Sequence, residues 1–163
     1  MYARPYLDSS VYIAAIKGSP PEPPGREGIA RKILEGAERG DYRIAASTFV
    51  AAEVVRDRGA PALPADKTGL VERYLEQPFI DWIELDLIAA RHARRLALEH
   101  DLRPADAVHL SSAIRADCDV LLRWDDGFHE GVYEGVVVTD PYWSGQEELD
   151  FPSADTGTDV LTE

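Results

Sequence analysis

Four acidic side chains lie where α/β proteins gather ligand-binding groups. Asp8 and Asp125 each follow a short apolar run, which is the pattern of a buried strand. Asp106 lies in the first turn of a predicted amphipathic helix, and Glu53 lies inside a predicted helix that is otherwise almost wholly apolar. The carboxyl ends of parallel strands and the N-termini of helices meet at one edge of a sheet. We therefore expect these four carboxylates to converge.

Converging carboxylates need a cation, because like charges at close range raise one another's pKa. Mg²⁺ and Mn²⁺ prefer oxygen ligands, and such ions activate water for attack on a phosphodiester. Each acid also has an ordinary interpretation: Asp8 as a cap or turn acid, Glu53 as a solvated helix acid, Asp106 as a helix-dipole acid and Asp125 as a turn residue. Their joint placement favours the metal site.

The elements that must position these acids alternate along the chain. We expect strands over 5–7, 42–46, 79–85, 120–122 and 136–138. We expect helices over 9–16, 29–40, 47–56, 67–75 and 86–100, with a further helix beginning at Pro104. Short, nearly continuous apolar strands between helices are typical of a parallel sheet covered on both faces. The predicted fold class is therefore α/β.

Composition limits the classes of function. The 163 residues fit one domain, over 1–143, followed by an acidic tail over 144–163 that we expect to be flexible. A net charge of −13 argues against nucleic-acid binding through the overall field, so any such contact must be local. No apolar run approaches the roughly 20 residues of a membrane span. Without a signal-like N-terminus, we expect a cytoplasmic protein.

Other candidate motifs are weaker. The four histidines show no zinc spacing, and we expect His109 to be a packed helix residue. No G-x-S-x-G elbow, Walker loop or dinucleotide fingerprint occurs. The cluster of Arg91, Arg94 and Arg95 predicts a solvated helix face, with local phosphate contacts as the alternative.

Four segments in this order resemble the PIN-domain ribonucleases, and most closely the toxins of bacterial and archaeal VapBC toxin–antitoxin pairs. The segments are LDSSVYI, STFVAAE, ADAVHLSSA and DVLLRWDDGF, and the resemblance extends from about Tyr6 to Pro141. It implies a PIN-like fold with a parallel five-stranded sheet flanked by helices. It also implies a Mg²⁺- or Mn²⁺-dependent endoribonuclease acting on RNA, a homodimer, and a small antitoxin as partner.

The resemblance assigns roles to particular residues. Asp8, Glu53, Asp106 and Asp125 match the family's acidic quartet and are the expected catalytic residues. Asp8, Asp106 and Asp125 would hold the ion, and Glu53 would hold a water molecule or help to deprotonate the nucleophile. Ser10 matches a Ser or Asn that supports the first carboxylate through a hydrogen bond.

Arg123 departs from the family pattern, which usually has Thr or Ser two residues before the last acid. Its cation could compete with a metal, or contact the scissile phosphate through its bidentate fork. Arg123 therefore also motivates an alternative function, a non-catalytic or weakened PIN module that binds RNA or a partner protein. A third reading is another metal phosphohydrolase, such as a DNA nuclease.

Overall fold

The structure is a computed structural model that describes residues 4–17, 25–55, 65–124 and 127–142. Its strands are β1 (Pro5–Leu7), β2 (Ile44–Ser47), β3 (Ile80–Ile83), β4 (Val120–Leu122), β5 (Gly131–Tyr133) and β6 (Val136–Thr139). Its helices are α1 (Ser9–Lys17), α2 (Arg26–Arg39), α3 (Thr48–Glu53), η1 (Ala65–Lys67), α4 (Thr68–Leu75), α5 (Leu87–His100) and α6 (Pro104–Arg115). The tail over 144–163 lies outside the described residues.

The strands form one sheet in the order β3-β2-β1-β4-β6-β5. The five strands from β3 to β6 pair in parallel, which confirms the predicted parallel sheet. β5 is an additional strand that pairs antiparallel with β6 at the sheet edge. The sequence pattern did not predict β5, because its three residues are exposed or only partly buried and carry no apolar run.

β1 is the strand around which the sheet is built. It pairs with β2 on one side and with β4 on the other, and Tyr6 faces Ala45 and Leu121 in these two registers. The backbone N–H of Asp8 then donates to the Leu122 carbonyl at 3.2 Å, so Asp8 leaves the sheet beside the end of β4. Asp8 is thereby held at the carboxyl edge.

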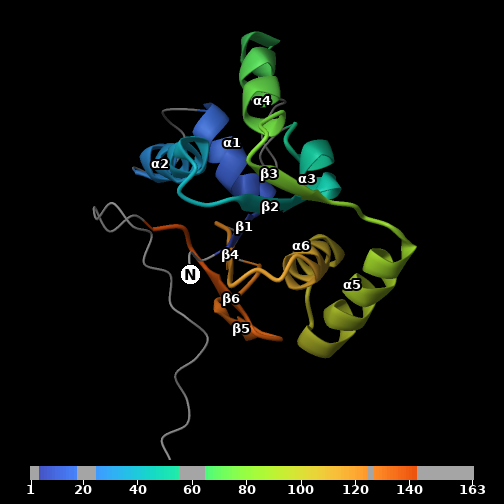
Figure 1. The fold of residues 1–163 in the computed structure, drawn as a ribbon. Helices are drawn as coiled ribbons and strands as arrows, with labels where there is room; N and C mark the ends of the chain where they lie inside the picture. Colours follow the sequence, from blue (N-terminus) through green and yellow to red (C-terminus); the bar gives the residue numbers. More distant parts are fainter. Residues whose placement is uncertain (1–3, 18–24, 56–64, 125–126, 143–163) are drawn as a thin grey trace, which may run out of the picture.

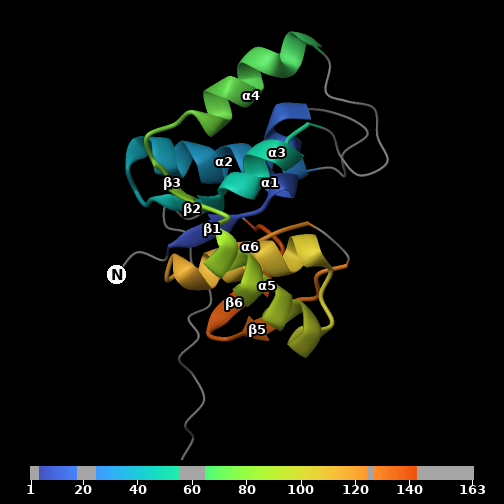
Figure 2. The same cartoon turned by 90° about the vertical axis from the view of Figure 1, so that its right-hand side faces the viewer.

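Helices cover both faces of this sheet (Figures 1 and 2). α1, α2, α3 and α4 lie on one face, and α5 and α6 lie on the other. Successive β1 side chains pack into the hydrophobic cores on opposite faces of the sheet, because side chains alternate along a strand. Leu7 packs in the core beneath α1 and α2, whereas Tyr6 packs in the core beneath α6.

Three helix starts have a local cause, and two of these helices, α3 and α6, carry site acids. The Ser47 side chain accepts a hydrogen bond from the Phe49 amide at 3.2 Å and so caps α3, the helix that ends at Glu53. Asp86 caps α5 by accepting from the Ala89 amide at 2.7 Å. Pro104 opens α6, as expected for a residue without a backbone donor.

Within the described part of the chain, no helix has the length and apolarity needed to cross a membrane.

Candidate functional site

Asp8 is a buried carboxylate with a defined orientation. Asp8 is 7% exposed. Its Oδ1 accepts hydrogen bonds from the Ser10 amide, at 2.9 Å, and from the Ser10 hydroxyl. The Ser10 hydroxyl oxygen in turn accepts from the Trp124 amide at 2.9 Å, just after β4. Ser10 thus makes the contact that the family resemblance implied, and it ties Asp8 to the segment leading to Asp125.

Burial dominates the electrostatics of Asp8. It raises the pKa of this carboxyl to about 6, against the opposing effects of the His109 charge and the Ser10 hydrogen bonds. The charge of Glu53 raises the same pKa slightly further. Asp8 is therefore a desolvated acid beside another acid, an arrangement that a bound cation stabilises.

Asp106 is held by a cation from the residue just before its helix. It is 5% exposed, and Arg103 donates to it from Nε at 2.7 Å and from a terminal nitrogen at 3.2 Å. Gly127 leaves room for this arginine, because a Cβ there would lie 2.4 Å from the guanidinium carbon. No role was assigned to Arg103 from the sequence, and its contact with Asp106 becomes evident in the turn before α6.

Glu53 contacts a histidine from α6. Its Oε2 lies 2.8 Å from Nε2 of His109, and its side chain is 24% exposed. On the opposite edge of the imidazole, Nδ1 lies 2.9 Å from the hydroxyl of Tyr6. His109 is buried, as expected for a packed helix residue, but its contact with Glu53 was not predicted. The three-residue spacing from Asp106 was the available signal, since it places both on one helix face.

Asp8, Glu53 and Asp106 converge electrostatically on His109. Burial would lower the pKa of this imidazole, but the hydrogen bond to Glu53 and the charges of the three acids outweigh burial and raise it. Three predicted site acids from three different elements therefore act on one buried group. The fourth acid, Asp125, lies outside the described residues.

Arg123 directs its charge toward β6. It is 5% exposed, and one terminal nitrogen pairs with Oδ1 of Asp140, directly after β6. Its backbone N–H donates to the Thr139 carbonyl at 3.1 Å. The proposed contact with a phosphate stays a prediction, and in this structure the guanidinium has a carboxylate partner.

The site acids suit a hard divalent cation by their chemistry, since their donors are carboxylate oxygens and one of them is strongly desolvated. Their oxygens do not form a compact ligand group here: among the described residues, the group of three ligand atoms within 4.8 Å of one another is Glu99, His100 and Glu134. That trio is on the surface, where Arg95 pairs with both glutamates. At the candidate site, Arg103 pairs with Asp106, and Nε2 of His109 lies 2.8 Å from Oε2 of Glu53.

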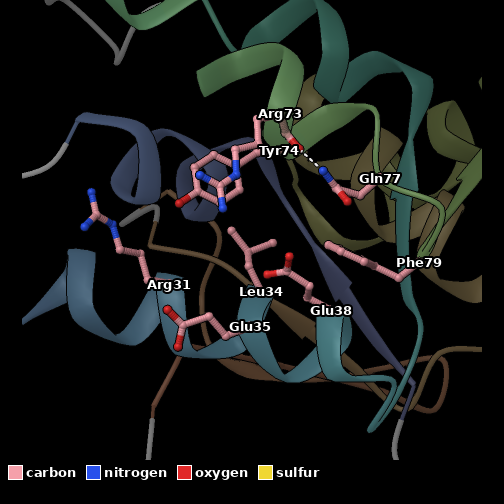
Figure 3. A pocket seen from close by; sticks show the side chains of 8 residues that line it. All are labelled: Arg31, Leu34, Glu35, Glu38, Arg73, Tyr74, Gln77 and Phe79. Atoms are coloured by element: carbon pink, nitrogen blue, oxygen red, sulfur yellow. Dashed lines mark hydrogen bonds between the residues drawn. The ribbon is translucent and has the colours of Figure 1, made fainter. Parts of the chain in front are cut away.

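A surface pocket lies elsewhere, between α2 and α4 (Figure 3). Figure 3 shows that its lining combines charged and aromatic side chains, and none of the three described site acids, Asp8, Glu53 and Asp106, takes part. The lining residues are Arg31, Leu34, Glu35, Glu38, Arg73, Tyr74, Gln77 and Phe79. The acids lie instead at the carboxyl ends of β1 and β2 and at the start of α6, so the pocket is separate from the candidate site.

Comparison with known proteins finds ribonucleases among the relatives of this chain. Ribonuclease VapC45 of Mycobacterium tuberculosis is 36% identical over 87 residues, which are 47% of this chain and 60% of the relative. Ribonuclease VapC49 of the same species matches equally well. The chain therefore spans about 60% of the length of these curated relatives.

Solved structures share the fold at low identity. The M. tuberculosis toxin VapC20, described as cleaving the sarcin–ricin loop, has a TM-score of 0.56 and 13% identity, covering 75% of this chain and 90% of its own. A toxin–antitoxin complex from Klebsiella pneumoniae has a TM-score of 0.56 and 22% identity, with coverages of 84% and 97%. The PIN domain family model matches residues 6–131. The chain therefore belongs to the PIN-domain family.

Proposed function

We propose that this protein is a metal-dependent endoribonuclease and the toxin component of a type II toxin–antitoxin pair. The observation that carries this proposal is the placement of three acids at the carboxyl edge of a parallel sheet: Asp8 directly after β1, Glu53 at the end of α3 after β2, and Asp106 in the first turn of α6. Membership of the PIN-domain family and the names of its ribonuclease relatives support the same reaction class.

Asp8, Asp106 and Asp125 would hold Mg²⁺ or Mn²⁺. A bound ion would lower the pKa of water and supply a nucleophile for attack on the phosphodiester. Ser10 fixes the orientation of the Asp8 carboxylate through its two hydrogen bonds. Glu53, which is only partly buried, would accept a proton from the attacking water. Cleavage by water would leave 5′-phosphate and 3′-hydroxyl ends.

The partners belong to the same proposal. We infer a small antitoxin protein, a homodimer, RNA as substrate and a cytoplasmic location. Structures of related fold include toxin–antitoxin complexes, one of them bound to promoter DNA. We also place the catalytic domain at residues 1–143, with the acidic tail outside it.

The test is cleavage by protein purified free of any antitoxin. We expect Asp8→Asn and Asp106→Asn to lose cleavage at every Mg²⁺ or Mn²⁺ concentration, and EDTA to abolish wild-type activity. Asp81→Asn is the matched control, because Asp81 pairs with Arg43 and Arg4 and contacts none of the site acids. Wild-type rates in Asp8→Asn would contradict the proposal.

The second candidate function is a non-catalytic PIN module that binds RNA or a partner protein. It is motivated by Arg103, which already compensates the charge of Asp106, and by Arg123 in place of the usual hydroxyl. Titration with Mn²⁺, following RNA binding and RNA cleavage separately, distinguishes the two functions. Binding without cleavage at any metal concentration would favour the module, and comparing RNA with DNA of equal sequence would test the DNA nuclease reading.

A further inference from the structure

A chain of close polar contacts, two of them hydrogen bonds, runs from the sheet interior to the candidate site. The Ser47 amide lies 3.0 Å from the Tyr6 hydroxyl oxygen, which lies 2.9 Å from Nδ1 of His109. Nε2 of His109 then lies 2.8 Å from Oε2 of Glu53. Four residues from β1, β2, α3 and α6 are thus joined in sequence.

The direction of each bond in this chain can be assigned by counting protons. A backbone amide can only donate, so the Tyr6 oxygen accepts from Ser47. Among the described residues, His109 is the other polar partner of that hydroxyl, so the phenolic proton is directed to Nδ1. A neutral imidazole that accepts at Nδ1 carries its proton on Nε2, the nitrogen that lies 2.8 Å from Oε2 of Glu53.

Burial supports this assignment. It raises the pKa of Tyr6 well above its ordinary value, so the phenol keeps the proton that it donates. The imidazole is 3% exposed and lies between two aromatic rings, with centroids 5.9 Å from both Tyr6 and Phe49. Water has little access to the ring, and its neighbours leave it little freedom to turn.

We propose that Tyr6 and His109 are positioning residues that orient the Glu53 carboxylate for the reaction. Glu53 is the last residue of α3, where the helix hydrogen-bond ladder ends, so its side chain gains orientation from a donor on another helix. The Nε2–H of His109 fixes one carboxylate oxygen and leaves the other free to accept a proton. This inference rests on the proposed function, because it assigns Glu53 a role in that reaction.

The tautomer of His109 is a readout that does not depend on catalysis. We expect the ¹⁵N shifts of the ring, taken at the high-pH limit, to place the proton of the neutral form on Nε2. Tyr6→Phe should shift the Nδ1 resonance of the neutral ring, because the donor to Nδ1 is lost while the aromatic ring is kept, and should leave the proton on Nε2 beside Glu53. A neutral wild-type ring protonated on Nδ1 would overturn the proposal, and so would an unchanged Nδ1 shift in Tyr6→Phe.

Two amide substitutions at His109 separate positioning from packing. Gln places its amide nitrogen near the position of Nε2 and keeps a donor to Glu53, whereas Asn reaches only the position of Nδ1. We expect His109→Asn to lower kcat roughly 10- to 100-fold with KM for a labelled single-stranded RNA unchanged. His109→Gln should stay within about threefold of wild type. Equal losses in both variants would contradict positioning through Nε2.

The final test is whether the effect of His109→Asn depends on the Glu53 carboxylate. In a Glu53→Gln background, His109→Asn should cost less than about twofold, because residues that act as a unit are not additive. A full second loss would show that His109 acts by another route and would overturn the proposal. If the wild-type protein cleaves no RNA probe, the proposed function fails, and the tautomer measurement alone decides whether the hydrogen-bond chain exists.

Discussion

Arg103, in the turn that opens α6, donates two hydrogen bonds of 2.7 and 3.2 Å to the carboxylate of Asp106. A metal ion and a guanidinium compete for the same carboxylate oxygens, so the ion must displace or share this partner. We expect Arg103→Met to tighten Mn²⁺ binding by roughly 2- to 10-fold, the range expected for an ion pair of modest strength. Isothermal titration calorimetry measures the change.

Arg95→Met provides the control for this measurement. Arg95 also pairs with carboxylates, Glu99 and Glu134, but none of them belongs to the candidate site. Its substitution should leave Mn²⁺ affinity unchanged. Weaker binding by Arg103→Met would show that the arginine orders the site for the metal and does not compete with it.

Asp8 should destabilise the metal-free protein at neutral pH. Its folded pKa of about 6 lies above the ordinary aspartate value of 3.8, so ionisation penalises the folded state. This reduction in the free energy of unfolding is absent below pH 4, grows between pH 4 and 6, and levels off above pH 6. Asp8→Asn should therefore add roughly 1 to 3 kcal/mol to the free energy of unfolding at pH 7.5 in EDTA, and little at pH 4.

Denaturant unfolding at the two pH values tests this prediction. Asp81→Asn is the comparison, because it should lower the free energy of unfolding at pH 7.5 where Asp8→Asn should raise it. Hydrogen bonding from Arg43 lowers the pKa of Asp81, so its ionised form stabilises the folded state above the unfolded pKa. That contribution is lost as the pH falls through the lowered folded pKa. A loss of stability in Asp8→Asn at pH 7.5 would contradict the assigned desolvation.

Arg123→Thr tests whether Arg123 contacts the scissile phosphate. Because the guanidinium is buried and paired with Asp140, we expect the substitution to cost about 1 to 3 kcal/mol of stability through lost packing and pairing. KM for RNA, measured well below the melting temperature, should not change. A raised KM with unchanged stability would instead support the phosphate contact.

The cap of α3 should matter for activity as well as stability. Ser47→Ala removes the acceptor for the Phe49 amide and should cost roughly 0.5 to 2 kcal/mol. It should also lower kcat, because α3 carries Glu53. Asp86→Ala removes the equivalent cap of α5, a helix with no predicted site acid, and should lower the melting temperature without lowering kcat. Equal effects of both on kcat would contradict this link.

Much of the fold could be predicted because its signals are local. A short apolar run identifies a strand such as β4 wherever it lies in the chain, and Pro104 and Asp86 mark helix starts by their own chemistry. β5 could not be found in this way. It exists because its backbone pairs with β6, and Val132 at its centre is 64% exposed.

The positions of Asp8, Glu53 and Asp106 along the fold could be predicted, whereas the side-chain partners of Glu53 and Asp106 were not predicted. A carboxylate after a strand, such as Asp8, has a position that topology alone dictates. The partner of Glu53 depends on how α6 packs over β1 and β2, which determines where His109 points. Arg103 lies only three residues before Asp106, and this local pair was not considered from the sequence. Asp125 lies outside the described residues, so its part in the site stays a prediction.

The pairing of β1 with β4 also has a consequence during synthesis. Pro5 pairs with Val120, so β1 can pair with β4 only after more than a hundred further residues have been synthesised. Contacts so distant in sequence form late because the loop between them must first close. A chain emerging from the ribosome therefore carries Asp8 long before the helix of Asp106 exists. The nascent protein should remain inactive toward nearby RNA until almost the whole domain has left the ribosome.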